Sequence, residues 1–305
     1  MLNLNVNNET SKLKAVVLGT ALSLGPTPKL EDCYDPKSRE HVLNNTYPIE
    51  EDLTQEMQEF CDVLKKYNVT VYRPEKIENY NQIFSRDIAF VIEDKFVFAN
   101  VVEDRSKEIQ GIKHLYDQIE DQNIIHLPES CHVEGGDVML CGNYVFIGTY
   151  SADDYSKYIT ARTNSQAVDV IEKLFPNKTI IPFELLKSND DARNSALHLD
   201  CCLQPVGNNK AITCPDGFLD KNQYQWIVDL FGADNIFEIS REEMYNMHCN
   251  IFSIDKNVVV SDRTFTRLNT WLEKNNFIVE KIKYTEVSKQ GGLLRCSTLP
   301  LIREN

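Results

Sequence analysis

Hydrophobic and polar positions along the chain follow two patterns that alternate about every fifty residues. Short apolar runs of strand length occur in pairs, and each pair is broken by a turn. The turn segments read EDK, CGN, GNN and DKN, which supply the tight or left-handed backbone positions of hairpins. Four complete pairs lie at 85–100, 134–149, 198–215 and 248–262. The pattern therefore predicts four β-hairpins.

A fifth strand pair is divided between the two ends of the chain. GGLLRCSTLPLIRE at 291–304 carries one apolar run, and LKAVVLGT at 13–20 carries the other. If five such modules close in a ring, the last strand has to pair with the first, so that no edge is left open. We therefore predict that the chain end lies beside the first strand and that the starts of the modules, here called the module heads, face a common axis.

Helical spacing fills the segments between the strand pairs. Residues 49–67 place apolar side chains at intervals of three and four, as one buried helix face requires. Ser240 followed by Glu243 forms a capping box for a helix near 241–247. Further helical patterns lie at 109–119, 167–174, 224–231 and 265–272. No Pro/Gly/Ser-rich or low-complexity linker separates the modules, so we predict one α/β domain over residues 1–305.

Composition narrows the classes of partner and compartment. The net charge of −14 argues against a nucleic-acid or anionic-membrane surface. The first residues lack the pattern of a signal peptide, and no apolar run approaches the roughly 18 residues of a membrane helix. The nine cysteines are odd in number, scattered and without a C-x-x-C pair. These features predict free thiols in a reducing compartment, and hence a cytoplasmic protein.

The module heads carry the side chains that could bind a ligand or react with it. They are Arg86, Asp87, Glu134, Asp137, His198, Asp200, Asn250 and Cys296. A ring would gather several carboxylates, one imidazole and one thiol in a small pocket, and crowded carboxylates are costly unless a cation neutralises them. A guanidinium has five N–H donors and can satisfy two or three carboxylates. The heads therefore favour a small cationic ligand of the guanidino class.

Each head also has a structural interpretation. Cys296 could be one more buried apolar residue, and His198 a hydrogen-bonded structural imidazole. The EGGD segment could be a hairpin corner with its acids in water, and Asp87 could form a local ion pair with Arg86. The functional interpretation is favoured because the unusual residues recur at equivalent points of successive modules.

A metal site is the main chemical competitor. The segments HVE and HLDCC offer ligands, including His132, Glu134 and His198. However, the adjacent Cys201 and Cys202 point to opposite faces of a strand, and no structural-zinc spacing is present. We therefore expect neither a metal nor another cofactor.

Five segments, taken in order, resemble the guanidino-group-modifying enzymes. They are SRD, HVEGGDV, TARTN, HLD and the terminal GGLLRCSTLPLIRE. This superfamily includes arginine deiminase, dimethylarginine dimethylaminohydrolase, agmatine deiminase and the amidinotransferases. The resemblance spans the chain from about residue 13 to residue 304. It implies a five-bladed α/β-propeller, often called the pentein fold.

The resemblance also implies a role for individual residues. Cys296 matches the nucleophile, His198 the general acid/base, and Glu134 the acid that pairs with the histidine or the guanidinium. The substrate-binding residues that it implies are Asp87 and Asp200, which clamp the guanidinium, and Arg162 of TARTN, which receives the α-carboxylate of the substrate. Arg86, Asp137 and Asn250 join this set by their place at the module heads, although Asp137 could serve only to fix its turn.

The implied chemistry runs through a covalent amidino-thioether on Cys296, which either water or an amine then releases. Hydrolysis is the preferred outcome, because the chain is compact and SRD and TARTN resemble the compact hydrolases. An amidinotransferase and a non-catalytic binder of guanidino ligands are the alternatives. The sequence leaves open which guanidine is used and whether the chain forms a homo-oligomer. It also leaves open whether residues 21–48, the longest irregular stretch, form a lid or an ordinary surface loop.

Overall fold

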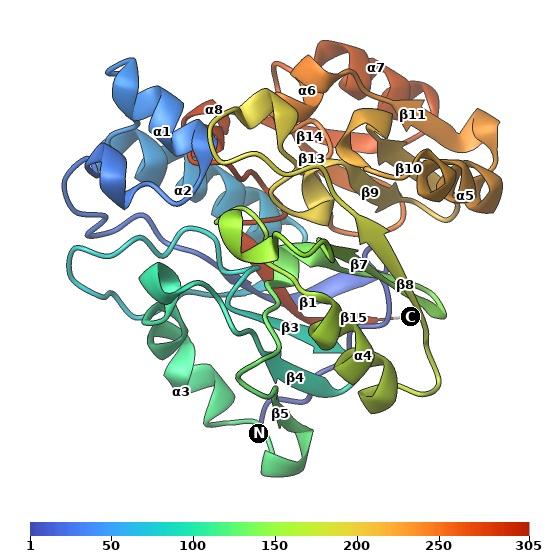
Figure 1. Ribbon diagram of the computed structural model, residues 1–305, viewed down its shortest axis with the longest axis horizontal. Helices are drawn as coiled ribbons and strands as arrows, with labels where there is room; N and C mark the ends of the chain where they lie inside the picture. The colour runs from blue at the N-terminus through green and yellow to red at the C-terminus, as the bar shows by residue number, and fades with distance from the viewer. Residues whose placement is uncertain (305) are drawn as a thin grey trace.

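Five three-stranded β-sheets form the framework of the computed structural model, which describes residues 1–304 (Figure 1). In each sheet two strands pair antiparallel, and a third strand pairs parallel to one of them. The sheets are β15-β1-β2, β3-β4-β5, β6-β7-β8, β9-β10-β11 and β12-β13-β14. The strands are β1 (Lys12–Leu18), β2 (Thr70–Tyr72), β3 (Ala89–Ile92), β4 (Lys95–Phe98), β5 (Ile124–His126), β6 (Val138–Cys141), β7 (Tyr144–Thr149), β8 (Thr179–Glu184), β9 (Leu203–Val206), β10 (Lys210–Thr213), β11 (Ile236–Glu238), β12 (Phe252–Ser253), β13 (Val258–Asp262), β14 (Ile278–Ile282) and β15 (Thr298–Glu304). The predicted hairpins are therefore confirmed.

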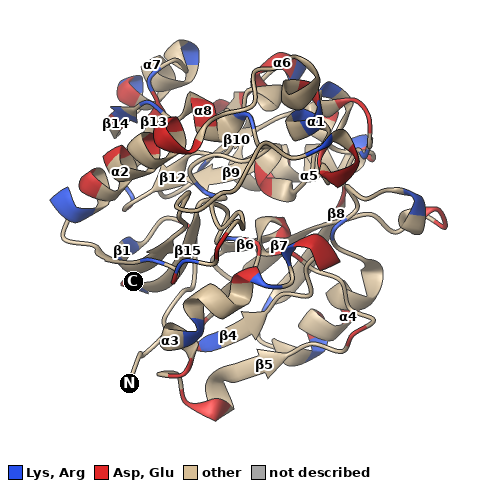
Figure 2. Ribbon diagram, turned by 90° about the vertical axis from the view of Figure 1, so that its left-hand side faces the viewer, with Lys and Arg blue, Asp and Glu red and all other residues tan. Residues whose placement is uncertain are grey.

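The helices lie between the strands: most of them form the crossovers that the parallel strand pairs need, while the two that follow β11 and β14 lead from one sheet to the next. The helices are α1 (Pro36–Leu43), α2 (Glu50–Lys66), α3 (Lys113–Tyr116), α4 (Ser165–Leu174), α5 (Lys221–Phe231), α6 (Arg241–Tyr245), α7 (Thr266–Lys274) and α8 (Thr285–Ser288). Helix α2 has an acidic first turn and a basic last turn, which complement the helix dipole (Figure 2). Ser240 and Glu243 form the predicted capping box at the start of α6. Among the helices of residues 1–304, none combines the length and apolar composition that a membrane crossing needs.

The helix predicted over 109–119 is wrong in extent. The structure forms a 3₁₀-helix at Glu108–Ile112, and only the four-residue α3 follows it. Gly111 packs closely against residues 74–82: its carbonyl accepts the Glu75 N–H (2.6 Å), and a Cβ there would lie 2.3 Å from the side-chain amide nitrogen of Gln82 and 3.0 Å from the Glu75 carbonyl oxygen. Helical periodicity was present in the sequence, but packing against residues 74–82 decided the local conformation.

The two ends of the chain pair as predicted. Strand β15 runs antiparallel to β1, with Val17 opposite Leu299 and Leu18 opposite Thr298. Leu299 is fully buried in a hydrophobic cluster with neighbours on several strands. Because Cys296 lies two residues before the start of β15, this pairing also fixes where the thiol lies.

Removing the apolar anchor of β15 should destabilise the fold without touching the site. We expect Leu299→Ala to lower the free energy of unfolding by about 2–5 kcal/mol, because a buried leucine leaves a cavity when it is truncated. Leu43→Ala is the matched control, since Leu43 is 57% exposed. Denaturant unfolding of both variants measures the difference. Equal stability of the two variants would contradict a buried terminal strand.

The module heads are joined to one another in a closed circuit of hydrogen bonds. The bonds run from Arg86 N to Cys296 O (3.0 Å), Gly135 N to Asp87 O (3.3 Å), Leu199 N to Asp137 Oδ1 (2.9 Å), Asn250 Nδ2 to Asp200 O (3.4 Å) and Leu294 N to Asn250 O (3.1 Å). Each bond links the head of one sheet to the head of the next. The five sheets therefore present their heads to a common centre, in a pseudo-symmetric α/β arrangement.

Candidate active site

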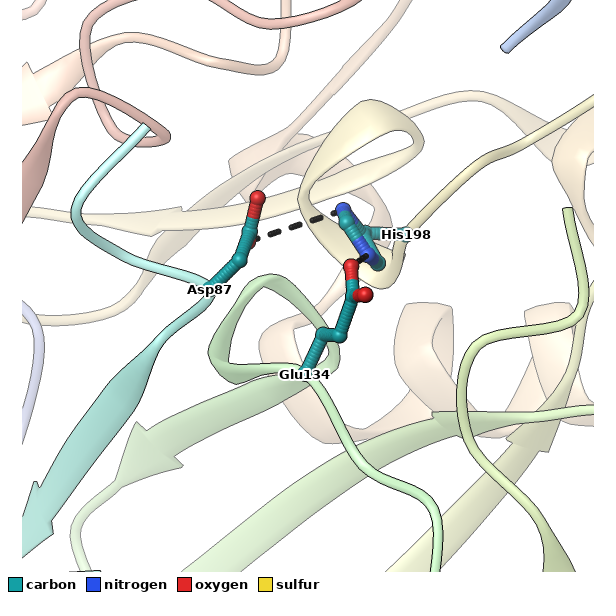
Figure 3. Close-up of side chains that lie close together, drawn as sticks. All are labelled: Asp87, Glu134 and His198. Carbon is teal, nitrogen blue, oxygen red and sulfur yellow. Dashed lines mark hydrogen bonds and ion pairs between the residues drawn. The ribbon is translucent and has the colours of Figure 1, made fainter. Parts of the chain in front are cut away.

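His198 lies between two carboxylates at the centre of the heads (Figure 3). Its Nε2 lies 2.8 Å from Oε2 of Glu134, and its Nδ1 lies 3.7 Å from Oδ1 of Asp87. Gly136 makes this packing possible, because a Cβ there would lie 2.6 Å from Nδ1 of His198 and 2.8 Å from Oδ1 of Asp87. The Gly136 N–H donates to the same Asp87 oxygen (3.1 Å). The EGGD segment therefore builds the site as well as the hairpin corner.

The imidazole of His198 is held in its charged form. Burial by itself would lower the pKa of His198, but the charge of Asp87, the hydrogen bond with Glu134 and the charge of Asp137 together raise it to about 9. At neutral pH both ring nitrogens therefore carry protons. Such a group can act as a general acid toward a departing nitrogen.

The charged state of His198 gives a prediction in solution. The pKa of His198 is raised above its ordinary 6.5, so its contribution to stability is complete below 6.5 and is lost as pH rises through about 9. His248 is the internal contrast, because burial lowers its pKa to about 4. We expect NMR to show one imidazole titrating near 9 and one near 4. If both histidines titrated near 6.5, the ion-pair geometry of His198 would be contradicted.

Cys296 is held by Asn250 and Asp200. The Asn250 amide nitrogen donates to Sγ of Cys296 (3.1 Å), and Sγ lies 3.4 Å from Oδ2 of Asp200. The amide oxygen of Asn250 accepts the N–H groups of Cys296 (3.0 Å) and Leu293 (3.1 Å). Burial and the charges of Asp200 and Asp87 raise the pKa of the thiol well above its usual range. Without a ligand, Cys296 is therefore a protonated thiol.

The glycines before Cys296 allow this placement. Gly291 adopts φ +81°, and a Cβ at Gly292 would lie 2.6 Å from the Phe84 ring and 2.9 Å from the Cβ of Cys296. The glycine pair therefore lets the segment that carries Cys296 pack against the module head that carries Asp87.

Glu134 is paired with Arg162. One Arg162 nitrogen lies 3.0 Å from each Glu134 oxygen, and another donates to the Tyr34 carbonyl (2.7 Å). Burial would raise the pKa of Glu134, but the Arg162 charge, the His198 hydrogen bond and the Arg105 charge hold it well below its usual range. Glu134 is therefore an anion, and Arg162 lies next to the His198 cluster.

Two further arginines belong to the site and were not singled out from the sequence. Arg105 lies 2.7 Å from Asp87 and pairs with Glu108 at 2.7 and 2.8 Å. Arg295 lies 2.9 Å from Asp200. Arg295 had a signal, since it directly precedes Cys296 in the terminal motif. Arg105 had none, because its segment EDRSKE resembles an ordinary charged loop.

Arg86 and Asp137 lie at the heads but outside the cluster around His198 and Cys296. Arg86 donates to the Arg295 carbonyl and to the Thr298 hydroxyl, both at 3.3 Å. Asp137 accepts from the Thr163 hydroxyl (2.7 Å) and from the N–H of the residue after His198. In this structure Asp137 fixes the backbone beside His198, and the Arg86 guanidinium is directed toward β15.

A cavity of about 660 Å³ adjoins the cluster, and both Arg105 and Arg162 line it. Its other walls include the aromatic side chains of Tyr155 and Tyr158. The irregular segment 21–48 contacts the site at Tyr34, through the hydrogen bond from Arg162, and its α1 begins two residues later. The carboxylates of the cluster and the Cys296 thiol are buried and are not among the walls of this cavity.

One group of side chains within residues 1–304 has the spacing of metal ligands. Ligand atoms of Asp87, Glu134 and His198 lie within 4.8 Å of one another. The positive charges beside these carboxylates are already provided by Arg105 and Arg162. A protonated imidazole cannot bind a metal through its nitrogens. The donor set therefore fits a network of ion pairs better than a metal centre.

Comparisons with known proteins identify a family and a fold for this chain. A model of the family described as N,N dimethylarginine dimethylhydrolase, eukaryotic, matches residues 35–303. The uncharacterized protein YkgA of Bacillus subtilis strain 168 is 28% identical over 251 residues, which cover 79% of this chain and 77% of that protein.

Solved structures share the fold. SxtG, an amidinotransferase from Microseira wollei in the saxitoxin pathway, has a TM-score of 0.78 at 17% identity, covering 99% of this chain and 98% of that chain. The N-terminal domain of ArgZ, an arginine dihydrolase of cyanobacteria, has a TM-score of 0.78 at 15% identity, covering 96% and 98%. Since its family model matches most of the sequence, the chain belongs to the N,N dimethylarginine dimethylhydrolase family, within the pentein superfamily of enzymes that modify guanidino groups.

Proposed function

We propose that the protein is a cysteine-dependent hydrolase that acts on the guanidinium group of arginine or an arginine derivative. The observation that carries the proposal is that the nucleophile lies close to the carboxylates that would bind the substrate. Asp200 lies 3.4 Å from the Cys296 thiol, while Asp87 and Glu134 bracket a charged His198. A thiol, a proton donor and several carboxylates around one centre suit a cationic, planar substrate.

Substrate binding activates the nucleophile in this scheme. The guanidinium would lie between Asp87 and Asp200, the two carboxylates whose charges raise the pKa of the thiol. Its positive charge offsets theirs, so the pKa of Cys296 falls and the thiol releases its proton to solvent. The thiolate then attacks the central guanidinium carbon and forms a tetrahedral adduct.

His198 moves the protons of the later steps. The protonated imidazole donates to the departing nitrogen, the C–N bond breaks, and an amidino-thioether remains on Cys296. Neutral His198 then takes a proton from water, and the hydroxide adds to the amidino carbon. Collapse of this second adduct breaks the C–S bond, the hydroxyl proton of the adduct passes to the departing Cys296 sulfur, and a urea-type product is released, citrulline if arginine is the substrate. His198 is again protonated, so the cycle closes without a cofactor.

The remainder of the substrate would occupy the 660 Å³ cavity. Arg162 lies between this cavity and Glu134, so we propose that it receives a carboxylate of the substrate, with Arg105 beside it. Asn250 serves the nucleophile through its hydrogen bonds to Cys296. Asp137 and Arg86 support the heads from outside the substrate position.

An amidinotransferase is the second candidate. The cavity is larger than a guanidinium needs, and the solved structures of similar fold include SxtG, whose name states that it is an amidinotransferase. In this alternative an amine takes the place of water in the second attack. The covalent intermediate and the residues would be the same.

The architecture of the whole chain belongs to the same proposal. We propose that the five sheets close as the blades of a propeller and that residues 1–305 form one domain, which the circuit of hydrogen bonds between the heads supports. The proposed ligand is a small guanidino compound. Cytoplasmic location stays a prediction from the cysteine content.

A panel of guanidino compounds tests this function. Arginine, its methylated forms, agmatine and guanidino acids are incubated with the protein, with and without an added amine, and products are identified by mass spectrometry. A urea-type product without the amine supports the hydrolase, whereas a new guanidine formed only with the amine supports the transferase. Binding of guanidines without any product would support a non-catalytic binder.

A further inference from the structure

We infer that Glu9, far from every motif in the sequence, is a positioning residue that acts through Arg295 on Asp200 and thereby on Cys296. Glu9 belongs to the segment that precedes β1, and only 5% of its surface is exposed. Its N–H donates to the Leu140 carbonyl (3.2 Å), and its Oε1 accepts the Leu140 N–H (3.4 Å). The inference rests on the proposed function, in which Asp200 clamps the guanidinium.

Arg295 connects Glu9 to the clamp. Its Nε and one terminal nitrogen donate to the two Glu9 oxygens at 3.2 and 3.0 Å, and its other terminal nitrogen donates to Asp200 Oδ2 at 2.9 Å. The remaining donors reach the carbonyls of Gly136 (3.3 Å) and Val138 (2.8 Å). The fork of Arg295 is thus fully engaged and fully buried. The Asp200 oxygen that it holds is the one that contacts the Cys296 thiol.

Glu9 is the anion that balances a buried group of arginines. Burial would raise the pKa of Glu9, but the charges of Arg295, Arg86 and Arg303 lower it to about 2. Arg86 lies 4.0 Å from Glu9. If Glu9 were neutral, Asp200 would become the principal counter-charge of these guanidinium groups.

Two consequences at the site follow from that shift of charge. Asp200 would attract the substrate guanidinium less strongly, because its charge would be offset by Arg295. It would also repel a thiolate less strongly, and the groups whose charges act on the thiol are Asp200, Asp87 and Cys201. Neutralising Glu9 should therefore weaken substrate binding while making the unliganded thiol easier to ionise. A loosened fold would act differently, because it would also expose the buried thiols of Cys202 and Cys249.

The test is Glu9→Gln, with Glu56→Gln as the matched control. Glu56 is also a buried carboxylate, but it accepts the backbone N–H groups of Glu286 and Val287, and its ion-pair partner is Lys283 and not an arginine of the heads. Alkylation by iodoacetamide is followed across pH at each cysteine by peptide mass spectrometry. KM and kcat are measured with the guanidine that the wild-type protein turns over.

For Glu9→Gln we expect the alkylation midpoint of Cys296 to fall by about one pH unit and KM to rise about tenfold, with Cys202 and Cys249 as protected as in the wild type. Glu56→Gln should leave the midpoint and KM in place. A folded Glu9→Gln protein with wild-type midpoint and KM overturns the inference, as does equal alkylation of all the buried thiols.

Glu9→Asp keeps the inference testable if Glu9→Gln does not fold. The shorter carboxylate keeps its charge but cannot reach both Arg295 nitrogens as Glu9 does, so we expect the same changes at smaller size. Wild-type behaviour of a folded Glu9→Asp, where Glu9→Gln gives no folded protein, overturns the positioning role. If the wild-type chain turned over no guanidine but the alkylation shift appeared, the proposed function would fail while the link from Glu9 to Cys296 held.

Discussion

Cys296→Ser is expected to abolish turnover while leaving guanidine binding in place. We expect kcat to fall by at least about 10³-fold, because removal of a nucleophile removes the covalent route. Asp87, Asp200 and Glu134 stay in the variant, so the dissociation constant measured by calorimetry should change by less than about threefold, which is well under 1 kcal/mol.

Cys131→Ser is the matched control for this substitution. Cys131 is also buried, and its thiol lies 3.7 Å from the Gln166 carbonyl, which a serine hydroxyl can contact in its place. Its kcat should remain close to that of the wild type. Full activity in Cys296→Ser would contradict the covalent mechanism. If Cys296→Ser lost guanidine binding as well as turnover, the Cys296 side chain would be needed to position the carboxylates that bind the guanidinium.

Glu134→Ala is expected to damage both stability and turnover. The substitution leaves Arg162 buried without its carboxylate and removes the 2.8 Å partner of His198. Breaking a buried ion pair by removing one partner costs about 3–5 kcal/mol. Turnover should fall as well, because the pKa of His198 loses the contribution of its hydrogen bond with Glu134.

Asp117→Ala supplies the comparison on the surface. Asp117 pairs with Lys113 at 2.6 Å, but both side chains are more than half exposed. An exposed pair of this kind contributes about 0.3–0.5 kcal/mol. Denaturant unfolding of the two variants should therefore separate them clearly. Similar losses in both would mean that Glu134 is not the buried counter-charge of Arg162.

The framework of the fold could be predicted from local pattern. Hairpin turns and apolar runs are short-range signals, and they located the strand pairs correctly. The pairing of β15 with β1 joins opposite ends of the chain, yet it was predictable because a ring of modules leaves the last strand a single partner. The break in the helix expected at 109–119 could not be predicted, because it depends on the contact of Gly111 with Gln82, and helical periodicity does not indicate such a contact.

The site also contains residues that the sequence indicated and residues that it did not. His198 and Cys296 stand in recognisable segments, and the structure places each beside carboxylates that the sequence also indicated. Arg105 and Arg295, which pair with Asp87 and Asp200, were missed. Glu9 and Arg295 are 286 residues apart in the chain, and such a buried pair leaves no spacing or composition that could reveal it. Charge balance in a buried cluster is a property of the assembled heads.

Trapping the covalent intermediate tests the central claim most directly. The protein is mixed with the guanidine it turns over, labelled with ¹³C at the guanidinium carbon, and the reaction is quenched with acid during turnover. Peptide mass spectrometry then locates the label among the nine cysteines. The proposed mechanism predicts a labelled amidino adduct on the peptide that contains Cys296. Turnover with no adduct there, or with the label on another residue, would contradict it.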